Sequence, residues 1–174
     1  MNVRALSERD EVNLIVGFFD LRGFAKWSEH QNSRELFNFA AELFKRTSIH
    51  IDRAGGHLIK SIGDAGLFIF PEDNPDLALT ELQSMKQDVD GWLEKLGYPE
   101  IMSIKIQLGP VAPGYIGLKE EMRFDVYGKT VNHAAMMKGW PLAISAQLHA
   151  KLTAENQSKF HQIDNGELVC GVSL

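Results

Sequence analysis

The sequence predicts an α+β domain with a βαββαβ core, in which helices cover one face of an antiparallel sheet and extra elements follow at the C-terminal end. Two observations predict this fold class. Short apolar runs bounded by turn residues are separated by two long segments in which apolar residues recur at helical spacing. Two successive apolar runs are also joined by a tight Gly-Asp turn, which favours an antiparallel hairpin in the middle of the pattern.

The first strand and the first helix are expected within residues 13–53. Residues 13–20 are mostly apolar and are predicted to form a buried strand. Ser33 is the expected N-cap of the helix that follows, because apolar residues then recur three and four positions apart. Ala54-Gly55-Gly56 supplies the residues that end this helix.

A hairpin, a second helix and a further strand complete the predicted core. Residues 57–62 and 66–71 are the hairpin strands, and they meet at Gly63-Asp64. Residues 75–96 carry one continuous apolar face and are predicted to form a helix, and the strand after it is expected at 101–109. This order is that of a ferredoxin-like fold, and it makes the first strand a sheet neighbour of the hairpin.

The elements after the core are shorter. Gly109-Pro110 and Pro113-Gly114 are expected to break the chain before a strand at 122–127. The remaining predicted elements are a helix near 130–138, a helix near 144–152 capped by Ser145, and a hairpin over 160–172 that turns at Asp164-Asn165-Gly166.

Composition narrows the class of protein. The chain has 174 residues, which fits one domain over 1–174, and 18 basic against 23 acidic residues give a formal charge of −5. This balance argues against a general nucleic-acid or membrane-surface binder. One cysteine excludes an intrachain disulfide. The polar N-terminal residues are not expected to be a signal peptide, and no apolar run approaches transmembrane length. A cytoplasmic location is therefore expected.

Asp20 and Asp64 each lie where an apolar strand runs into a turn. A carboxylate at the end of a buried strand is costly unless a cation offsets its desolvation. Because each also lies near a glycine that lets a backbone come close, the two suggest a divalent metal and a phosphate. The alternative for either residue alone is ordinary Asp-Gly turn chemistry.

Three segments of the chain carry a family resemblance. They read FFDLRGFAKWSE at 18–29, GHLIKSIGDA at 56–65, and GPVAPGYIG at 109–117 followed by FDVYGKTVNHAA at 124–135. In this order and spacing they resemble the catalytic domain of class III adenylyl and guanylyl cyclases, whose fold is similar to a polymerase palm. The resemblance covers roughly residues 14–137.

The resemblance implies a two-metal cyclisation of a nucleoside triphosphate, in which the ribose 3′-oxygen attacks the α-phosphorus and pyrophosphate leaves. Asp20 and Asp64 match the ligands of two Mg²⁺ or Mn²⁺ ions, together with a main-chain carbonyl near Leu21. Arg22, Gly23, Phe24 and the residue after them would offer backbone N–H groups to the β- and γ-phosphates.

The same resemblance assigns base and ribose recognition. Lys60, four residues before Asp64, and Asp125, seven before Asn132, match the two purine readers. A lysine donates to adenine N1 and a carboxylate accepts from the 6-amino group, so this pair favours ATP over GTP. The alternatives are a solvated strand lysine and a surface ion-pair partner of Arg123. Asn132 matches the residue that orients the ribose.

Two positions depart from the family. Met136 stands four residues after Asn132, where the family carries an arginine that stabilises the transition state. Such a charge is worth about 10³–10⁵ in rate, and methionine cannot supply it. Cys170 stands where a lysine of the C-terminal hairpin would reach the triphosphate.

Three functions follow from this pattern. The first is an adenylate cyclase that acts as a homodimer, since the family builds each site from the metal aspartates of one subunit and the purine readers of the other. The second, favoured by Met136 and Cys170, is a nucleotide-binding or regulatory dimerisation module with little turnover. The third is one half of a heterodimer whose partner supplies an arginine to the metals of this chain.

Overall fold

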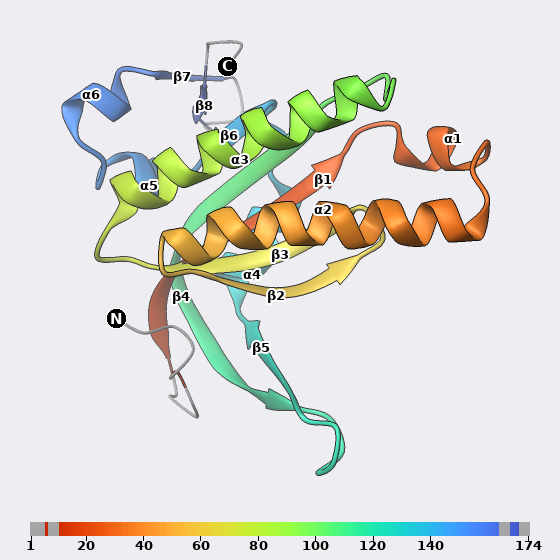
Figure 1. The fold of residues 1–174 in the computed structure, drawn as a ribbon. Helices are drawn as coiled ribbons and strands as arrows, with labels where there is room; N and C mark the ends of the chain where they lie inside the picture. The colour runs from red at the N-terminus through yellow and green to blue at the C-terminus, as the bar shows by residue number, and fades with distance from the viewer. Residues whose placement is uncertain (1–5, 7–10, 164–167, 171–174) are drawn as a thin grey trace.

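The computed structural model describes residue 6, residues 11–163 and residues 168–170. The described residues form a sheet of eight strands. Figure 1 shows two long helices, α2 and α3, lying across it. In chain order the elements are β1 (Val12–Leu21), α1 (Phe24–Ser28), α2 (Ser33–Arg53), β2 (His57–Ile62), β3 (Ala65–Pro71), α3 (Pro75–Lys95), β4 (Met102–Ile116), β5 (Arg123–Tyr127), α4 (Lys129–Met136), β6 (Leu142–Ile144), α5 (Ala146–His149), α6 (Ala154–Gln157), β7 (Phe160–Gln162) and β8 (Leu168–Cys170).

The sheet has the order β2-β3-β1-β4-β6-β8-β7, and β5 pairs with the far end of β4. β1 lies between β3 and β4 and is antiparallel to both, while β6 runs parallel to β4. The predicted βαββαβ core is confirmed by β1, α2, β2, β3, α3 and β4, in that order. The first strand is also a neighbour of the hairpin, as the sequence predicts.

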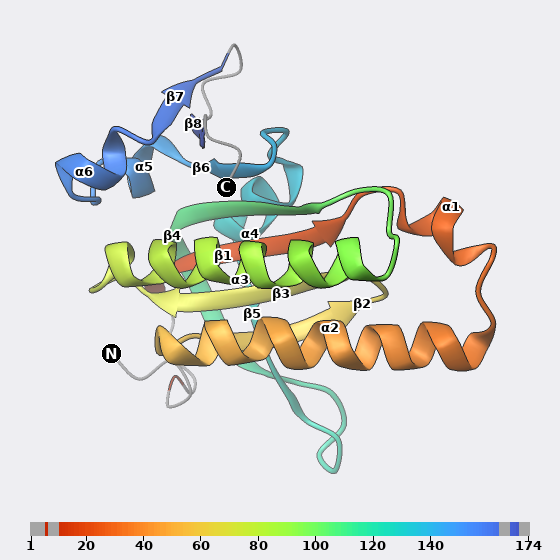
Figure 2. The same ribbon diagram turned by 45° about the horizontal axis from the view of Figure 1, so that its top comes forward.

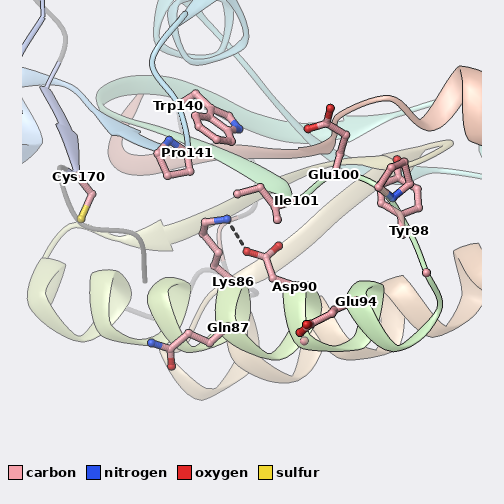
Figure 3. Close-up of a pocket in the computed structure, with 13 residues that line it drawn as sticks. Lys86, Gln87, Asp90, Glu94, Tyr98, Glu100, Ile101, Trp140, Pro141 and Cys170 are labelled. Carbon is pink, nitrogen blue, oxygen red and sulfur yellow. Dashed lines mark hydrogen bonds and ion pairs between the residues drawn. The ribbon is translucent and has the colours of Figure 1, made fainter.

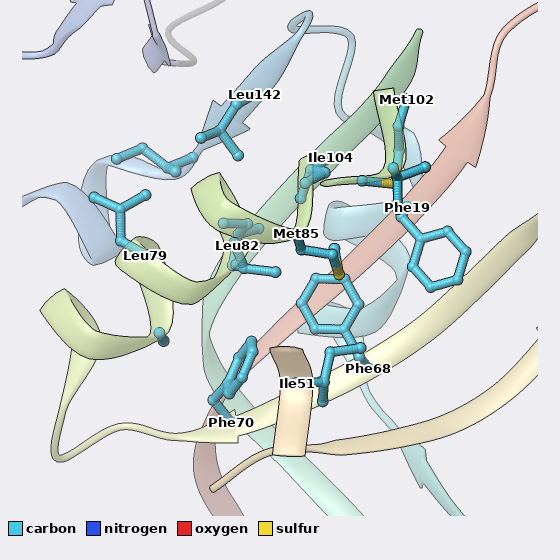
Figure 4. Packing of buried hydrophobic residues seen from close by; sticks show 14 of the residues in the cluster. Phe19, Ile51, Phe68, Phe70, Leu79, Leu82, Met85, Met102, Ile104 and Leu142 are labelled. Atoms are coloured by element: carbon cyan, nitrogen blue, oxygen red, sulfur yellow. The ribbon is translucent and has the colours of Figure 1, made fainter. Parts of the chain in front are cut away.

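The two long helices cover one face of the sheet, and Figure 2 shows α2 and α3 side by side along it. Apolar side chains of alternate strand positions fill the space between the layers, where Figure 4 shows Phe19 and Phe68 packed beside Met85 of α3. The rings of Phe19 and Phe68 stack with their centroids 6.4 Å apart. A second cluster, on the other face, joins Leu14 and Val16 to Ala134 of α4, so that one short helix lies opposite the long ones.

The N-cap of α2 is Asn32, so the prediction of Ser33 was wrong by one residue. The side chain of Asn32 accepts hydrogen bonds from the backbone N–H groups of Arg34 and Glu35, each at 3.0 Å. The Glu35 carboxylate in turn accepts from the Asn32 N–H at 2.9 Å. This reciprocal arrangement satisfies more of the free helix N–H groups than Ser33 could.

β4 runs without interruption from Met102 to Ile116, so the expected breaks at Gly109-Pro110 and Pro113-Gly114 were wrong. Pro110 is paired with Asn13 of β1, and Pro113 with Val126 of β5. In the described pairings each proline has a neighbouring strand on one side, which is where a residue without an N–H is tolerated in a sheet. The predicted strand at 122–127 is β5, and it forms a long arm with the end of β4 (Figure 1).

Beyond α4 the helices and strands are shorter and more numerous than the sequence predicts. The predicted helix near 144–152 is the short α5, whose N-cap is Ser145 as expected, while the residues just before it form β6. The predicted C-terminal hairpin is confirmed by β7 and β8, and its turn at 164–166 lies outside the described residues. In the described part of the chain, no helix is long and apolar enough to cross a membrane.

The Asp76 carboxylate links α3 to the C-terminal residues around α6 by hydrogen bonds. Asp76, in the first turn of α3, accepts hydrogen bonds from the Thr153 hydroxyl at 2.8 Å and from the Asn156 side chain at 2.6 Å. The Thr153 N–H donates to the same carboxylate at 3.1 Å. Burial opposes the charge of Asp76, but these hydrogen bonds and the charge of Lys159 outweigh it and lower the pKa of Asp76.

Candidate active site

The carboxylates of Asp20 and Asp64 meet at one end of the sheet. Asp20 is the second-last residue of β1, and Asp64 lies in the turn between β2 and β3. That turn is tight because Gly63 adopts a left-handed φ of 61°, which a glycine accepts without strain. Since β1 pairs with β3 up to Phe19, the turn brings Asp64 beside the end of β1.

The pKa of Asp64 reflects its closeness to Asp20. Burial, the charge of Asp20 and a hydrogen bond with the Asp20 side chain raise the pKa of Asp64 from 3.8 to about 6. Backbone hydrogen bonds at Asp64 itself and at Leu21 pull the pKa the other way. Two carboxylates in contact cannot both ionise freely, so the pair has an affinity for a proton or a cation.

This donor set fits a hard divalent cation. Carboxylate oxygens are the ligands that Mg²⁺ and Mn²⁺ prefer, and Mg²⁺ sites commonly use one or two carboxylates and complete the shell with water and substrate phosphates. Among the described residues no cluster of three or more His, Cys, Asp or Glu side chains could hold a metal by itself. Asp20 and Asp64 would therefore hold a metal together with phosphate oxygens and the nearby main chain at Leu21.

Lys60 and Asp125 form an ion pair between β2 and β5. The Lys60 ammonium lies 2.5 Å from Asp125 Oδ2, and it also faces the ring of Tyr127, 5.7 Å from the ring centroid. Asp125 is buried, whereas 41% of the Lys60 side chain remains exposed. The other oxygen of Asp125 accepts from the Val126 N–H at 2.9 Å. A hydrogen-bond donor and an acceptor thus stand together at this position.

The chain from Asp20 to Phe24, the 20–24 segment, joins β1 to α1. Gly23 has a left-handed φ of 73° and precedes the helix without any side-chain cap. The Phe24 ring packs against Phe39 of α2, with the ring centroids 5.8 Å apart. Arg22 is exposed, and its guanidinium lies 5.0 Å from the centroid of the Trp140 ring.

Tyr98 is a residue of this region that sequence reasoning missed. Its hydroxyl donates a 2.7 Å hydrogen bond to the Arg22 carbonyl. Burial raises the pKa of Tyr98, and the charges of Asp64, Asp20 and Glu100 raise it further, so the hydroxyl keeps its proton. No motif marks Tyr98 or Trp140, since each reaches the segment from a loop far away in the sequence.

Asn132 and Met136 lie on the exposed side of α4, and the Met136 side chain is 75% exposed. Within the described residues, the Asn132 side chain forms no hydrogen bond with Asp20, Asp64, Lys60 or Asp125. The structure thus brings four of the predicted residues together as two pairs, Asp20 with Asp64 and Lys60 with Asp125, and among the described residues no hydrogen bond joins the Asn132 side chain to either pair.

Cys170 does not reach either pair. It is buried in the core between the sheet and the long helices, whereas its neighbour Val169 packs with Met137 and Ala143 on the other face. Asp20 lies on that other face by strand alternation, because Val16 and Phe18 belong to the cluster there. The match of Cys170 to a triphosphate-binding lysine stays a prediction, and the Cys170 side chain itself packs in the core on the face covered by the long helices.

Two cavities border these residues. A small one of about 150 Å³ lies beside Asp20 and is also lined by Lys105 of β4 and Ala135 of α4. A larger one of about 710 Å³ lies between α3 and the loops before β4 and β6 (Figure 3). Its walls include Tyr98 and Trp140 but neither carboxylate of the Asp20–Asp64 pair, so its size alone does not make it the active site.

Comparisons with known proteins agree on one family. A family profile described as "Adenylate and Guanylate cyclase catalytic domain" matches residues 6–170. An adenylate cyclase of Anabaena cylindrica is 33% identical over 130 residues, which are 70% of this chain and 26% of that protein. Guanylyl cyclase C of Cavia porcellus is 30% identical over 139 residues, or 74% of this chain and 13% of that protein. The chain thus spans about a quarter or less of these two relatives.

Solved structures show the same fold. The adenylyl cyclase CyaB from P. aeruginosa superposes with a TM-score of 0.76 at 19% identity, covering 97% of this chain and 92% of that one. At this identity the likeness concerns the fold alone. The relatives include both adenylate and guanylyl cyclases, so they leave the choice of base to the residues of this chain.

Proposed function

The chain belongs to the family of adenylate and guanylate cyclase catalytic domains, and we propose that it converts ATP to cyclic AMP and pyrophosphate as a dimer. The proposal rests mainly on one observation: the same chain holds two pairs of side chains that suit different parts of a nucleotide. Asp20 and Asp64 form a carboxylate pair suited to divalent metal, and Lys60 with Asp125 forms a donor–acceptor pair suited to adenine.

The reaction needs a metal at the first pair. Mg²⁺ or Mn²⁺ there lowers the pKa of the attacking hydroxyl and neutralises the leaving group. Asp20 and Asp64 would supply the charged ligands, and the contact between the two carboxylates, which raises the pKa of Asp64, favours a cation between them. The backbone of the 20–24 segment would hold the triphosphate beside them.

Base selection is assigned to the second pair. The Lys60 ammonium can donate to the N1 acceptor of adenine, and the Asp125 carboxylate can accept from the 6-amino group. Guanine presents a donor and an acceptor in the opposite places, so the same pair would face it with two repulsive contacts. This favours ATP over GTP.

The proposal includes a dimer. In it, Asn132 and the base readers of a second subunit would face Asp20 and Asp64 of the first, which agrees with the absence of a hydrogen bond between Asn132 and either pair among the described residues. The arm formed by β4 and β5 carries exposed apolar side chains suited to such an association: Tyr115, Ile116, Leu118, Met122 and Tyr127. Exposed apolar groups gathered on one arm are typical of an association surface.

A second function is favoured by Met136. Met136 is exposed on α4, at the position where the family carries the arginine that stabilises the transition state, so this position lacks that positive charge. A regulatory module that binds ATP without turnover, or a heterodimer whose partner supplies the arginine, accounts for this residue.

One assay separates these functions. The purified chain is incubated with Mn²⁺ and either ATP or GTP, and cyclic nucleotide formation is measured beside nucleotide binding. Cyclic AMP formation that is lost in the Asp20→Asn, Asp64→Asn double variant and kept in Glu120→Gln, an exposed control, supports the enzyme. Binding of ATP without product supports the regulatory module, and no metal-dependent binding of either nucleotide contradicts both.

A further inference from the structure

The 20–24 segment depends on outside contacts for its shape. Its single left-handed residue, Gly23, has no side chain with which to cap α1, and that helix has only five residues. Within the segment, the Gly23 carbonyl accepts from the Trp27 N–H at 3.1 Å. Asp20 and Leu21 are paired with β4, so it is the part of the segment after Leu21 whose shape depends on the residues that pack against it.

Tyr98 holds the segment from the side of α3. Its hydroxyl donates to the Arg22 carbonyl at 2.7 Å, across 76 residues of sequence. Its ring is only 6% exposed and packs against Trp27 and Phe39, with centroid distances of 5.2 and 6.1 Å. The hydroxyl is therefore a rigid donor whose position is set by the core rather than by the segment.

Trp140 contacts the side chain of the same residue, Arg22. Its ring lies 5.0 Å from the Arg22 guanidinium, in the range of a cation–π contact. The next residue, Pro141, accepts a 2.9 Å hydrogen bond from the Ile104 N–H of β4, which fixes the loop to the sheet. Figure 3 shows Tyr98 and Trp140 on different walls of one cavity, with Glu100 between them. A Cβ added to Gly23 would lie 3.3 Å from Glu100 Cγ, so the segment fits closely on this side too.

We propose that Tyr98 is a positioning residue for the triphosphate: with Trp140 it clamps Arg22, and so holds the backbone N–H groups of the 20–24 segment in the arrangement that binds phosphate oxygens. Tyr98 acts through the segment and makes no contact with the base, so its hydroxyl contributes to phosphate binding alone. The inference rests on the proposed function, because it assumes that this segment receives phosphates.

The test compares phosphate-bearing and phosphate-free ligands. Tyr98→Phe removes only the hydroxyl, and Thr47→Val is the matched control, because Thr47 is also buried and also donates to a backbone carbonyl, that of Leu43 at 2.9 Å. Binding of Mn²⁺-ATP, Mn²⁺-tripolyphosphate and adenosine is measured by calorimetry or competition. One neutral hydrogen bond predicts that Tyr98→Phe weakens both phosphate ligands by about 3- to 10-fold and changes adenosine binding by less than about 2-fold.

Trp140→Leu, which keeps an apolar side chain, is expected to act in the same direction. Thermal unfolding of each variant establishes that it is folded before titration. Wild-type affinity of Tyr98→Phe for tripolyphosphate, or an equal loss for adenosine, overturns the inference. Absence of metal-dependent ATP binding in the wild-type chain instead overturns the proposed function, so the two failures are distinct.

Discussion

Lys60 of β2 and Asp125 of β5 are 65 residues apart in the sequence, and their charged groups are in contact. The pair neutralises a buried carboxylate that would otherwise be left without a cation. A purine that binds here must exchange part of this ion pair for its own hydrogen bonds. Under the proposed function, we therefore expect the pair to contribute to the choice of base as well as to the affinity.

Replacing Lys60 by methionine tests the pair. Lys60→Met leaves Asp125 buried without its cation, so the unfolding free energy is expected to fall by about 1–3 kcal/mol. ATP binding is expected to weaken by about 10-fold and the preference over GTP to disappear. Nucleotide titrations and chemical denaturation measure both effects. Lys45→Met is the control, since the Lys45 side chain is 70% exposed, and an unchanged ATP-to-GTP ratio in Lys60→Met would contradict the assignment.

Neutralising either member of the carboxylate pair tests the metal site. Asp20→Asn and Asp64→Asn are each expected to abolish Mn²⁺-dependent ATP binding. Because the substitution removes repulsion between two carboxylates, the unfolding free energy without metal is expected to stay level or rise. Chemical denaturation in the presence of a chelator measures the unfolding free energy of each variant, and Glu120→Gln is the control. ATP binding that persists in both variants would show that the metal lies elsewhere.

Met136→Arg tests the missing charge. Met136 is 75% exposed, so an arginine can be placed there without burying its charge. Turnover is expected to rise by at least about 10-fold with little change in ATP affinity, since a transition-state contact changes rate more than ground-state binding. The control is Leu96→Arg, an exposed position at the end of α3. If Met136→Arg is folded and dimeric but no faster, the absent arginine is not what limits the chain.

The arm of β4 and β5 is the expected dimer contact. Leu118 is 80% exposed at its tip, and Leu118→Asp is expected to raise the dimer dissociation constant by about 10-fold or more, as loss of a buried apolar contact predicts. Sedimentation equilibrium measures it. Phe37→Asp is the matched control, because Phe37 is 64% exposed on α2, away from the arm. A wild-type chain that stays monomeric at high concentration with nucleotide present would refute the dimer.

Asp76 gives a pH-dependent contribution to stability. Its pKa is lowered in the folded state, so its contribution is fully present above the unfolded pKa of about 3.9 and is lost as the pH falls through the folded value. Asp76→Ala is expected to lower the unfolding free energy by about 1–2 kcal/mol at neutral pH. Denaturation of both proteins between pH 3 and 7 should show the difference shrinking below about pH 4. If the difference in unfolding free energy between the two proteins does not change with pH, the charge of the Asp76 carboxylate does not contribute to stability.

The parts of the fold that the sequence predicts well are those with a local signal. The apolar period of α2 and α3, and the Gly63-Asp64 turn, specify elements that depend little on distant residues. The continuation of β4 through Pro110 could not be predicted, because it depends on which side of the strand has a neighbour. The short β6 is likewise decided by its pairing with β4 and β8 rather than by its own three residues.

In the candidate site, too, some contacts have a local sequence signal and others have none. Asp20 and Asp64 could be paired from the sequence, because a strand end and a hairpin turn fall at the same edge of the sheet. The contact between Tyr98 and Arg22 could not, since it joins two loops with no shared motif. Strand alternation in the structure turns Cys170 towards the helices, and motif spacing in a short segment carries no such information.

The unbroken course of β4 also limits how the length of the chain can change. β4 pairs with β1 up to Val111 and with β5 from Ala112, so no residue separates the central sheet from the arm. Strand side chains alternate, so one residue inserted at this junction would turn every later side chain of the strand to the opposite face. The arm would then present Asp125 away from Lys60. If Lys60 and Asp125 act together as proposed, the number of residues at this junction matters to function as much as their identity does.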